Sequence, residues 1–252
     1  MKSLTNSLVL LALTPLSLSA AVTTFSGLSY EQPLTALPGW TASEANPTNA
    51  PLAWAEPVAG NMAGAIGGAY AEAVNTRFST TMASSFYSSM GTISLDVMLR
   101  SSTSIAPGRD SFTVGVATVG GTSLIDIVFA PAVTVAGIDR WEVGYAVSGG
   151  TINYTGLVLN EDAWYDIGLA FDGPNFAFTF GNSVSTNTAT GTITGFDGAT
   201  AGVGDLTFGW NKASATPYGD NYMLFDNVES IPEPSAALLG GLASIFLFRR
   251  RR

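Results

Sequence analysis

Strict alternation of apolar and polar side chains is the feature of this chain that most limits what it can fold into. In residues 92–99, TISLDVML, every second side chain from Ile93 to Leu99 is apolar, and most of the others are polar. Because successive side chains of a β-strand point to opposite faces, a period of two is typical of a strand with one buried face. The same period occurs in residues 111–118, 140–147, 165–171, 176–180 and 206–210.

The segments between these strands complete an all-β pattern. Further strands are predicted over residues 22–30, 123–130, 151–159 and 222–228. Pro131 is expected to end the strand of residues 123–130. Residues 31–61 show no period and are expected to form an irregular connection with one short strand near 52–55. Residues 62–74 contain three glycines and are expected to form a loop or a bulged strand. Ten or more strands at spacings of about 10–15 residues predict an antiparallel two-sheet jelly-roll sandwich, with residues 22–230 as one domain.

The body also resembles the concanavalin A-like lectin and glucanase (laminin G-like) jelly rolls. The stretches that carry the resemblance are GTISLDVML (91–99), DSFTVGV (110–116), AWYDI (163–167) and LFDNV (224–228). The resemblance implies a sandwich of two antiparallel sheets with a carbohydrate-binding role. A galactose-binding-like or other carbohydrate-binding module is an alternative, because strand pairing is not visible in a sequence.

The last twenty-two residues, 231–252, have a different character. Pro232, Glu233 and Pro234 form an extended break, and residues 235–248 are an uncharged, mostly apolar run. Four arginines follow: Arg249, Arg250, Arg251 and Arg252. As a helix the apolar run would span about 21 Å, less than the roughly 30 Å of a bilayer core. Basic residues beside an apolar segment favour the cytoplasmic side, which would leave the body outside.

This order resembles the PEP-CTERM sorting signal of Gram-negative bacteria. The resemblance implies that the tail meets an exosortase in the inner membrane and is processed near the Pro-Glu-Pro motif. Residues 235–248 would then be a transient transmembrane helix, and the arginines would act as a topology stop. An ordinary tail anchor is the alternative.

The first twenty-one residues have the layout of a secretory signal peptide. Lys2 is followed by an apolar segment, residues 8–18, and then by small residues up to Ala21. Cleavage is expected after Ala20 or Ala21, and a buried N-terminal helix is the alternative. The two ends together predict an exported protein that is anchored transiently in the inner membrane and then lies at the cell surface or outside the cell.

Composition argues against several classes of function. Residues 22–230 hold eighteen carboxylates against five arginine and lysine side chains, a formal charge of −13. Nucleic acids and anionic membrane surfaces bind basic patches, so neither is expected as a partner of the body. The chain has no cysteine and no histidine. The chain therefore has no disulfides and no thiolate nucleophile, and it lacks histidine, the commonest general base and metal ligand.

Catalysis by paired carboxylates is compatible with this composition, because glycoside hydrolysis needs two acids about 5–10 Å apart. The glucanases that the body resembles carry their acids at alternating positions of one strand, as Glu-x-Asp-x-(x)-Glu. Here Asp96, Asp126 and Asp166 are each the lone acid within their predicted strands. We therefore expect no catalytic residue and no enzyme activity, with a glycan hydrolase as an alternative.

Aromatic side chains in or beside the irregular, Gly- and Pro-rich segments are candidates for stacking against sugar rings. The candidate glycan-binding residues lie in or beside irregular segments and are Trp40, Trp54, Tyr70, Trp210 and Tyr218. For each of them, partial packing beneath a long loop is the interpretation that we favour over an exposed ring. Trp141 and Trp164 lie within strand patterns and are expected in the core.

Calcium is the one cofactor that the sequence suggests. The oxygen-bearing candidates near the end of the body are Asp220, Asn221, Asp226 and Asn227, and Asp172 with Asn175 form a second group. No dense D-x-D-x-D-G loop is present, and turn formation by Asp and Asn is the alternative.

These observations predict an exported, exosortase-sorted cell-surface or extracellular-matrix protein. Its lectin-like sandwich is expected to be non-catalytic and to take part in envelope or exopolysaccharide interactions. A lectin with one defined glycan is the alternative.

Overall fold

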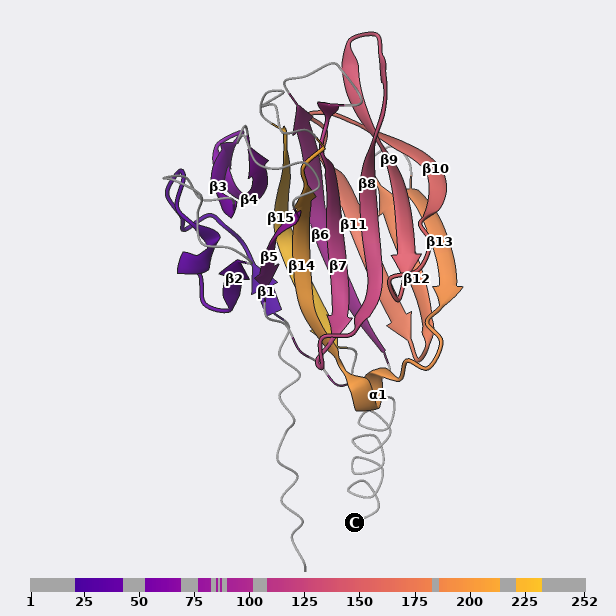
Figure 1. Ribbon diagram of the computed structural model, residues 1–252. Helices are drawn as coiled ribbons and strands as arrows, with labels where there is room; N and C mark the ends of the chain where they lie inside the picture. The colour runs from indigo at the N-terminus through magenta and orange to yellow at the C-terminus, as the bar shows by residue number, and fades with distance from the viewer. Residues whose placement is uncertain are drawn as a thin grey trace, which may run out of the picture.

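The computed structural model describes residues 21–42, 53–68, 77–82, 85, 87, 90–101, 108–182, 186–213 and 221–232. These residues form two antiparallel sheets stacked face to face, so the predicted β-sandwich is confirmed (Figure 1). The predicted signal peptide up to residue 20 and the predicted sorting signal from Glu233 onward lie outside the described residues.

The first sheet has the strand order β13-β12-β11-β6-β15-β4-β3, with β1 paired to β15. Its strands are β1 Ala21–Thr23, β3 Ala53–Val58, β4 Asn61–Gly68, β6 Met90–Ser101, β11 Tyr165–Asp172, β12 Asn175–Gly181, β13 Thr186–Thr192 and β15 Asn221–Pro232. The second sheet has the order β10-β9-β8-β7-β14-β5-β2. Its strands are β2 Trp40–Ala42, β5 Arg77–Met82, β7 Ser111–Thr118, β8 Ser123–Val135, β9 Ile138–Val147, β10 Asn153–Asn160 and β14 Val203–Asn211.

The predicted alternation sets which side of each strand faces the core. In β6 the side chains of Ile93, Leu95 and Val97 are at most 2% exposed, whereas the alternating polar side chains are half-buried on the outer face. In β12, Phe178 is fully buried in the same way. Met98 departs from this pattern, because it lies on the outer face and is still buried. Its neighbours there form a second, smaller apolar cluster, described below.

An aromatic stack joins the two sheets at the centre of the core. Trp40 of β2, Phe208 of β14 and Phe225 of β15 lie nearly parallel, and the ring centroids of Phe208 and Phe225 are 3.9 Å apart. Phe25 packs edge-on against Trp40 and Phe225, with centroids 5.6 Å from each. Trp40 is therefore a core residue, and its buried ring does not suit the candidate role of stacking against a sugar. No period is visible around Trp40 because β2 is only three residues long.

Glycines in β4 allow the same aromatic packing. Residues 61–68 form strand β4, which pairs with β3 without a shift of register and so corrects the expectation of a loop or a bulge there; residues 69–74 of the predicted segment lie outside the described residues. A Cβ atom on Gly64 would lie 2.4 Å from Cε2 of Phe225, so a side chain there would displace the stacked ring. Gly67 has a φ of +135° and lies against the backbone of β15. These glycines allow neighbouring strands to pack closely; they do not form a turn.

Pro131 does not end β8, although its sequence position predicted that it would. The strand runs on to Val135, and Pro131 pairs with Trp141 of β9. The pairing of β8 with β7 stops at Phe129, which pairs with Phe112. Beyond Phe129 the β7 side of β8 is therefore an edge, where a residue without an N–H group is tolerated.

A buried polar network closes one end of the sandwich. The carboxylate of Asp110 accepts hydrogen bonds from Trp210 Nε1 at 2.7 Å and from the Ala213 amide at 2.9 Å, and its carbonyl accepts one from Trp141 Nε1. The adjacent Arg109 guanidinium lies 3.5 Å from Asp139 with its side chain fully buried. Trp210 is fully buried in this network, so its ring does not suit the candidate role of stacking against a sugar.

The two ends of the described chain lie side by side, because β1 pairs with β15 through Ala21 and Ser230 (Figure 1). Two short helices, η1 Leu34–Ala36 and α1 Gly198–Ala201, connect strands. Among the described residues, no helix has the length and apolar character needed to span a membrane.

Substitution of Asp110 tests the polar network. We expect Asp110→Ala to lower the free energy of unfolding by about 2–4 kcal/mol, because it leaves the buried donors of Trp210 and Ala213 without an acceptor. Urea unfolding measures the change. Asp205→Ala is the control, since Asp205 is exposed in β14, and its loss should cost at most about 0.5 kcal/mol. Equal stability of the Asp110 variant and the native protein would contradict this role.

Candidate functional site

Three carboxylates lie in one row across the outer face of the first sheet. The register pairs Asp96 of β6 with Asp166 of β11 on one side and with Asp226 of β15 on the other. We call Asp166, Asp96 and Asp226 the acidic row. Each of the three strands contributes a single acid to the acidic row. An alternating pattern of acids within one strand could therefore not reveal the row in the sequence. The row depends on strand pairing alone.

A bulge in β15 directs a fourth polar side chain to the acidic row. The pairing of β15 with β6 shifts between Asp226 and Glu229, and Asn227 has a φ of +49°. Asparagine tolerates this left-handed conformation better than most residues. The Asn227 side chain donates a hydrogen bond from Nδ2 to Asp96 Oδ2 at 2.7 Å, and its backbone amide donates to Asp226 Oδ1 at 2.8 Å. Bulges often re-aim a side chain next to a functional site.

The turn between β3 and β4 supplies a second amide group. Asn61 begins β4 directly after Ala59 and Gly60, which both have positive φ angles. Its Nδ2 donates a hydrogen bond to Asp226 Oδ2 at 3.1 Å. Asp226, which is 7% exposed, is therefore bound through both of its oxygens by neutral donors.

The surroundings of Asp96 and Asp226 disfavour the negative charge of these two carboxylates. Burial raises the pKa of Asp96; the hydrogen bond from Asn227 opposes this shift, and the nearby carboxylate of Asp166 raises the pKa further. Burial likewise raises the pKa of Asp226, against the hydrogen bond from the Asn227 amide. Perturbed carboxylates in a hollow are typical of functional sites.

An apolar patch borders the acidic row on the same face. Met98 and Leu224 pair with each other two residues away from Asp96 and Asp226, and with Ala63 and Ala65 they form a buried cluster outside the main core. The partly buried side chains that pack on this cluster are Val58, Trp164 and Tyr222. We call this group the outer apolar cluster.

An ion pair fixes one side of the outer apolar cluster. Arg100 Nε lies 2.6 Å from Asp162 Oδ1, and Arg100 Nη1 donates a hydrogen bond to the Tyr222 hydroxyl at 3.1 Å. The guanidinium carbon lies 5.5 Å from the centroid of the Tyr222 ring. The loop before β11 and strand β15 are thus tied together next to Trp164.

The acidic row and the outer apolar cluster meet at a cavity of about 310 Å³. Its polar lining consists of Asp96, Asp226, Asn227 and Asn61, and its apolar lining of Trp164, Val58, Met62 and Ala63. We call it the Asp96 cavity. An aromatic ring, carboxylates and amides that converge on one hollow are typical of the lining of a small-molecule or sugar site.

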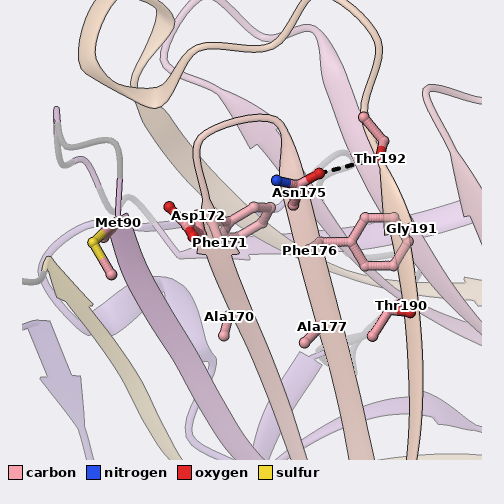
Figure 2. A pocket seen from close by; sticks show the side chains of 10 residues that line it. All are labelled: Met90, Ala170, Phe171, Asp172, Asn175, Phe176, Ala177, Thr190, Gly191 and Thr192. Carbon is pink, nitrogen blue, oxygen red and sulfur yellow. Dashed lines mark hydrogen bonds between the residues drawn. The ribbon is translucent and has the colours of Figure 1, made fainter.

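A second hollow of about 530 Å³ lies on the same face towards β13 (Figure 2). Small and polar side chains of β11, β12 and β13 line it, among them Ala170, Ala177 and Thr190. At its rim, Asn175 accepts a hydrogen bond from Thr192 at 3.2 Å. Along β6 and β11, Ser94 and Gly168 occupy the outer face between the two hollows, so no large side chain of these two strands separates them.

The candidate glycan-binding residues are not brought together. Trp40 and Trp210 are buried in the core, as shown above, and the side chains of Trp54, Tyr70 and Tyr218 lie outside the described residues. Trp141 is fully buried, as predicted. Trp164 was expected in the core but packs half-buried on the outer apolar cluster at the cavity. It lies in the loop directly before β11, two residues before the outward-facing Asp166, and this spacing was the signal that we missed.

The candidate calcium ligands divide between distant places. Asn221, which accepts a hydrogen bond from Ser101 at 2.7 Å, lies five positions before Asp226 in β15. A strand advances about 3.3 Å per residue, so the two are roughly 16 Å apart and do not share an ion. Asp220 lies outside the described residues. Within the described part of the chain, no group of three or more acidic side chains is arranged to hold a metal ion, and calcium at Asp172 and Asn175 stays a prediction.

Comparison with known proteins identifies the fold. No protein-family model matches the chain, and no curated protein matches its sequence. The winged bean acidic lectin complexed with methyl-α-D-galactose superimposes with a TM-score of 0.54 at 6% identity, covering 85% of this chain and all of the lectin. Peanut lectin gives a TM-score of 0.51 at 10% identity, covering 86% of this chain and all of the lectin. The predicted jelly-roll sandwich is thus confirmed.

An alginate lyase, Aly36B, in complex with alginate trisaccharide gives a TM-score of 0.53 at 10% identity, covering 86% of this chain and 99% of the lyase. This finding overturns the expectation of a body that is not an enzyme, because the same jelly roll serves lectins and polysaccharide-cleaving enzymes alike. At such low identity, the likeness shows the fold and leaves the choice of activity to the site.

The acidic row makes a prediction about stability. A carboxyl group whose pKa is raised in the folded state binds its proton more tightly there than in the unfolded chain, so stability falls as the pH rises through the folded pKa. We therefore expect Asp96→Asn to raise the melting temperature at pH 7, by up to about 2–4 °C for roughly 1 kcal/mol, and to have less effect at acid pH. Thermal unfolding at both pH values measures this. Asp126→Asn, on the outer face of the second sheet, is the matched control, and a destabilised Asp96 variant at pH 7 would contradict the prediction.

Proposed function

We propose that this chain is an exported protein whose jelly roll binds carbohydrate at the Asp96 cavity. The observation that carries the proposal is the meeting of an aromatic ring, two carboxylates and two amide groups at one hollow of a lectin-like sheet. Sugars offer an apolar ring face and a rim of hydroxyl groups, and this lining matches both properties. Related folds that hold methyl-α-D-galactose and an alginate trisaccharide support the assignment.

Each side chain of the cavity has a distinct role in this proposal. The Trp164 indole, supported from below by Met98 and Leu224, provides the surface against which a pyranose ring packs. Asp96 and Asp226 accept hydrogen bonds from sugar hydroxyls through the lone pairs that Asn227 and Asn61 leave unused. Those two asparagines hold the carboxylates in place before a ligand arrives, which lowers the entropic cost of binding.

A polysaccharide-cleaving enzyme is the second candidate. The observation that favours it is the lateral pairing of Asp96 with Asp166. Burial and, after it, the neighbouring Asp166 carboxylate raise the pKa of Asp96, and a carboxyl group with a raised pKa can serve as a general acid. Incubation with polysaccharides, followed by assays for new reducing ends and for the ultraviolet absorbance of unsaturated products, distinguishes hydrolysis, elimination and simple binding.

Sorting by the C-terminal tail is the second part of the proposal. We propose that an exosortase processes the chain near the Pro-Glu-Pro motif and that the body then acts at the cell surface or in the extracellular matrix, in envelope or exopolysaccharide interactions. The described strand β15 ends at Pro232, and β1 begins at Ala21. Cleavage after Ala20 and beyond Pro232 would therefore leave every described strand whole.

Removal of the Trp164 ring tests the binding site. We expect Trp164→Ala to weaken binding to a recognised polysaccharide by about tenfold or more, since loss of one stacking surface of about 1.4 kcal/mol has this effect. Affinity electrophoresis across a polysaccharide panel, followed by calorimetry, measures it. Tyr154→Ala is the control, because Tyr154 is an exposed aromatic residue of the second sheet. Unchanged affinity of a folded Trp164 variant would place the site elsewhere.

The mass of the mature protein tests sorting. We expect the protein recovered from the producing cell to lack residues 1–20 and the arginine cluster, and to lie outside the inner membrane. Intact-mass spectrometry of fractionated cells gives both answers. A membrane-bound chain that still ends in Arg252 would indicate a plain tail anchor.

A further inference from the structure

The two sheets differ strongly in charge. The strands of the first sheet contain six acidic residues: Glu56, Asp96, Asp166, Asp172, Asp226 and Glu229. They contain one cationic residue, Arg100, whose guanidinium is paired with Asp162. The strands of the second sheet contain four acidic residues, Asp126, Asp139, Glu142 and Asp205, and two cationic ones, Arg77 and Arg140. Negative charge is thus concentrated on the sheet that carries the Asp96 cavity.

The carboxylates at the cavity have neutral partners. Asp226 is bound by Asn61 and by the Asn227 amide, and Asp96 by the Asn227 side chain. Among the described residues, no lysine or arginine forms an ion pair with a member of the acidic row. Amide donors orient a carboxylate but do not neutralise it, so the charge remains for a ligand to meet.

The Trp164 ring completes a site for a cation. It lines the same cavity as Asp96 and Asp226, and a cation over the face of an indole is attracted by the ring quadrupole. An ammonium group has three donors and no acceptor, which suits a hollow lined by carboxylate oxygens and an aromatic face. A uronate would instead bring a fourth carboxylate beside the row, and close like charges disfavour binding.

We propose that the Asp96 cavity selects glycans that carry free amino groups and rejects polyuronates. This specificity rests on the proposed function, because it assumes that the cavity binds sugars. It separates the chain from the alginate lyase of the same fold, whose bound trisaccharide is a polyanion. The sugar ring would pack on Trp164 while its ammonium group lies between Asp96 and Asp226.

Calorimetry with three matched oligosaccharides tests the proposal on the full body of the protein. The probes are a glucosamine hexamer, the same hexamer fully N-acetylated, and an alginate oligomer of equal length, at physiological ionic strength. We expect the amino hexamer to bind about tenfold or more tightly than the acetylated one, and the alginate oligomer to give no measurable heat. Asp96→Asn and Asp166→Asn should each bring the ratio of the first two affinities towards one; Asp166 is exposed, so its substitution leaves folding intact.

Two controls separate recognition from general attraction to an acidic protein. Asp126→Asn removes a carboxylate from the second sheet and should keep the native ratio, whereas Trp164→Ala should weaken binding of the amino hexamer. If Asp126→Asn lowers the ratio as much as Asp96→Asn does, diffuse charge explains the preference and the inference is overturned. Equal affinities for the amino and acetylated hexamers would also overturn it and leave carbohydrate binding in place. Failure of all three probes and of a wider glycan panel would remove the proposed function itself.

Discussion

The antiparallel register of β6 between β11 and β15 is the constraint on which both the core and the site depend. It places Ile93, Leu95 and Val97 between the sheets and, by the same alternation, Asp96 beside Asp166 and Asp226 on the outer face. A slip of one residue in any of these strands would turn its apolar side chains out and its acid in. The aromatic stack of Trp40, Phe208 and Phe225 makes such a slip costly, because it fixes β15 against the opposite sheet.

The site is formed where the regular sheet is interrupted. The bulge at Asn227 and the turn before Asn61 both use positive φ angles, and both deliver an amide to Asp226. The row of like charges that they hold would be disfavoured on a surface selected for stability alone. Conversely, Asp110 has a structural role, since its carboxylate and its carbonyl accept hydrogen bonds from Trp210, Ala213 and Trp141 and close one end of the sandwich. Burial and access to a hollow, rather than residue type, separate the two groups.

The fold was predictable from the sequence because alternation is a local property. Residues 92–99 and 165–171 each show their buried face without reference to any other strand, and enough such segments define an all-β sandwich. The site was not predictable, because the acidic row arises from pairing between strands more than a hundred residues apart in the case of Asp96 and Asp226. The search for exposed rings failed for a related reason. Trp40 and Trp210 lie beside irregular segments, yet the strands β2 and β14 carry them into the core, whereas Trp164 lies in the loop before β11 and packs on the outer face. Asn221 and Asp226 were grouped as calcium ligands because they are close in the sequence, but an extended strand holds them far apart.

Binding of a glycan at the Asp96 cavity is the central claim, and amide and indole resonances report on it most directly. Titration of the isotope-labelled body with a bound oligosaccharide, followed by two-dimensional nitrogen–proton NMR, maps the surface that the ligand touches. We predict that the largest shifts fall on the Trp164 indole and on the backbone and side-chain amides of Asn61 and Asn227, all at the cavity. Shifts confined to the second sheet, with those three residues unmoved, would contradict the account.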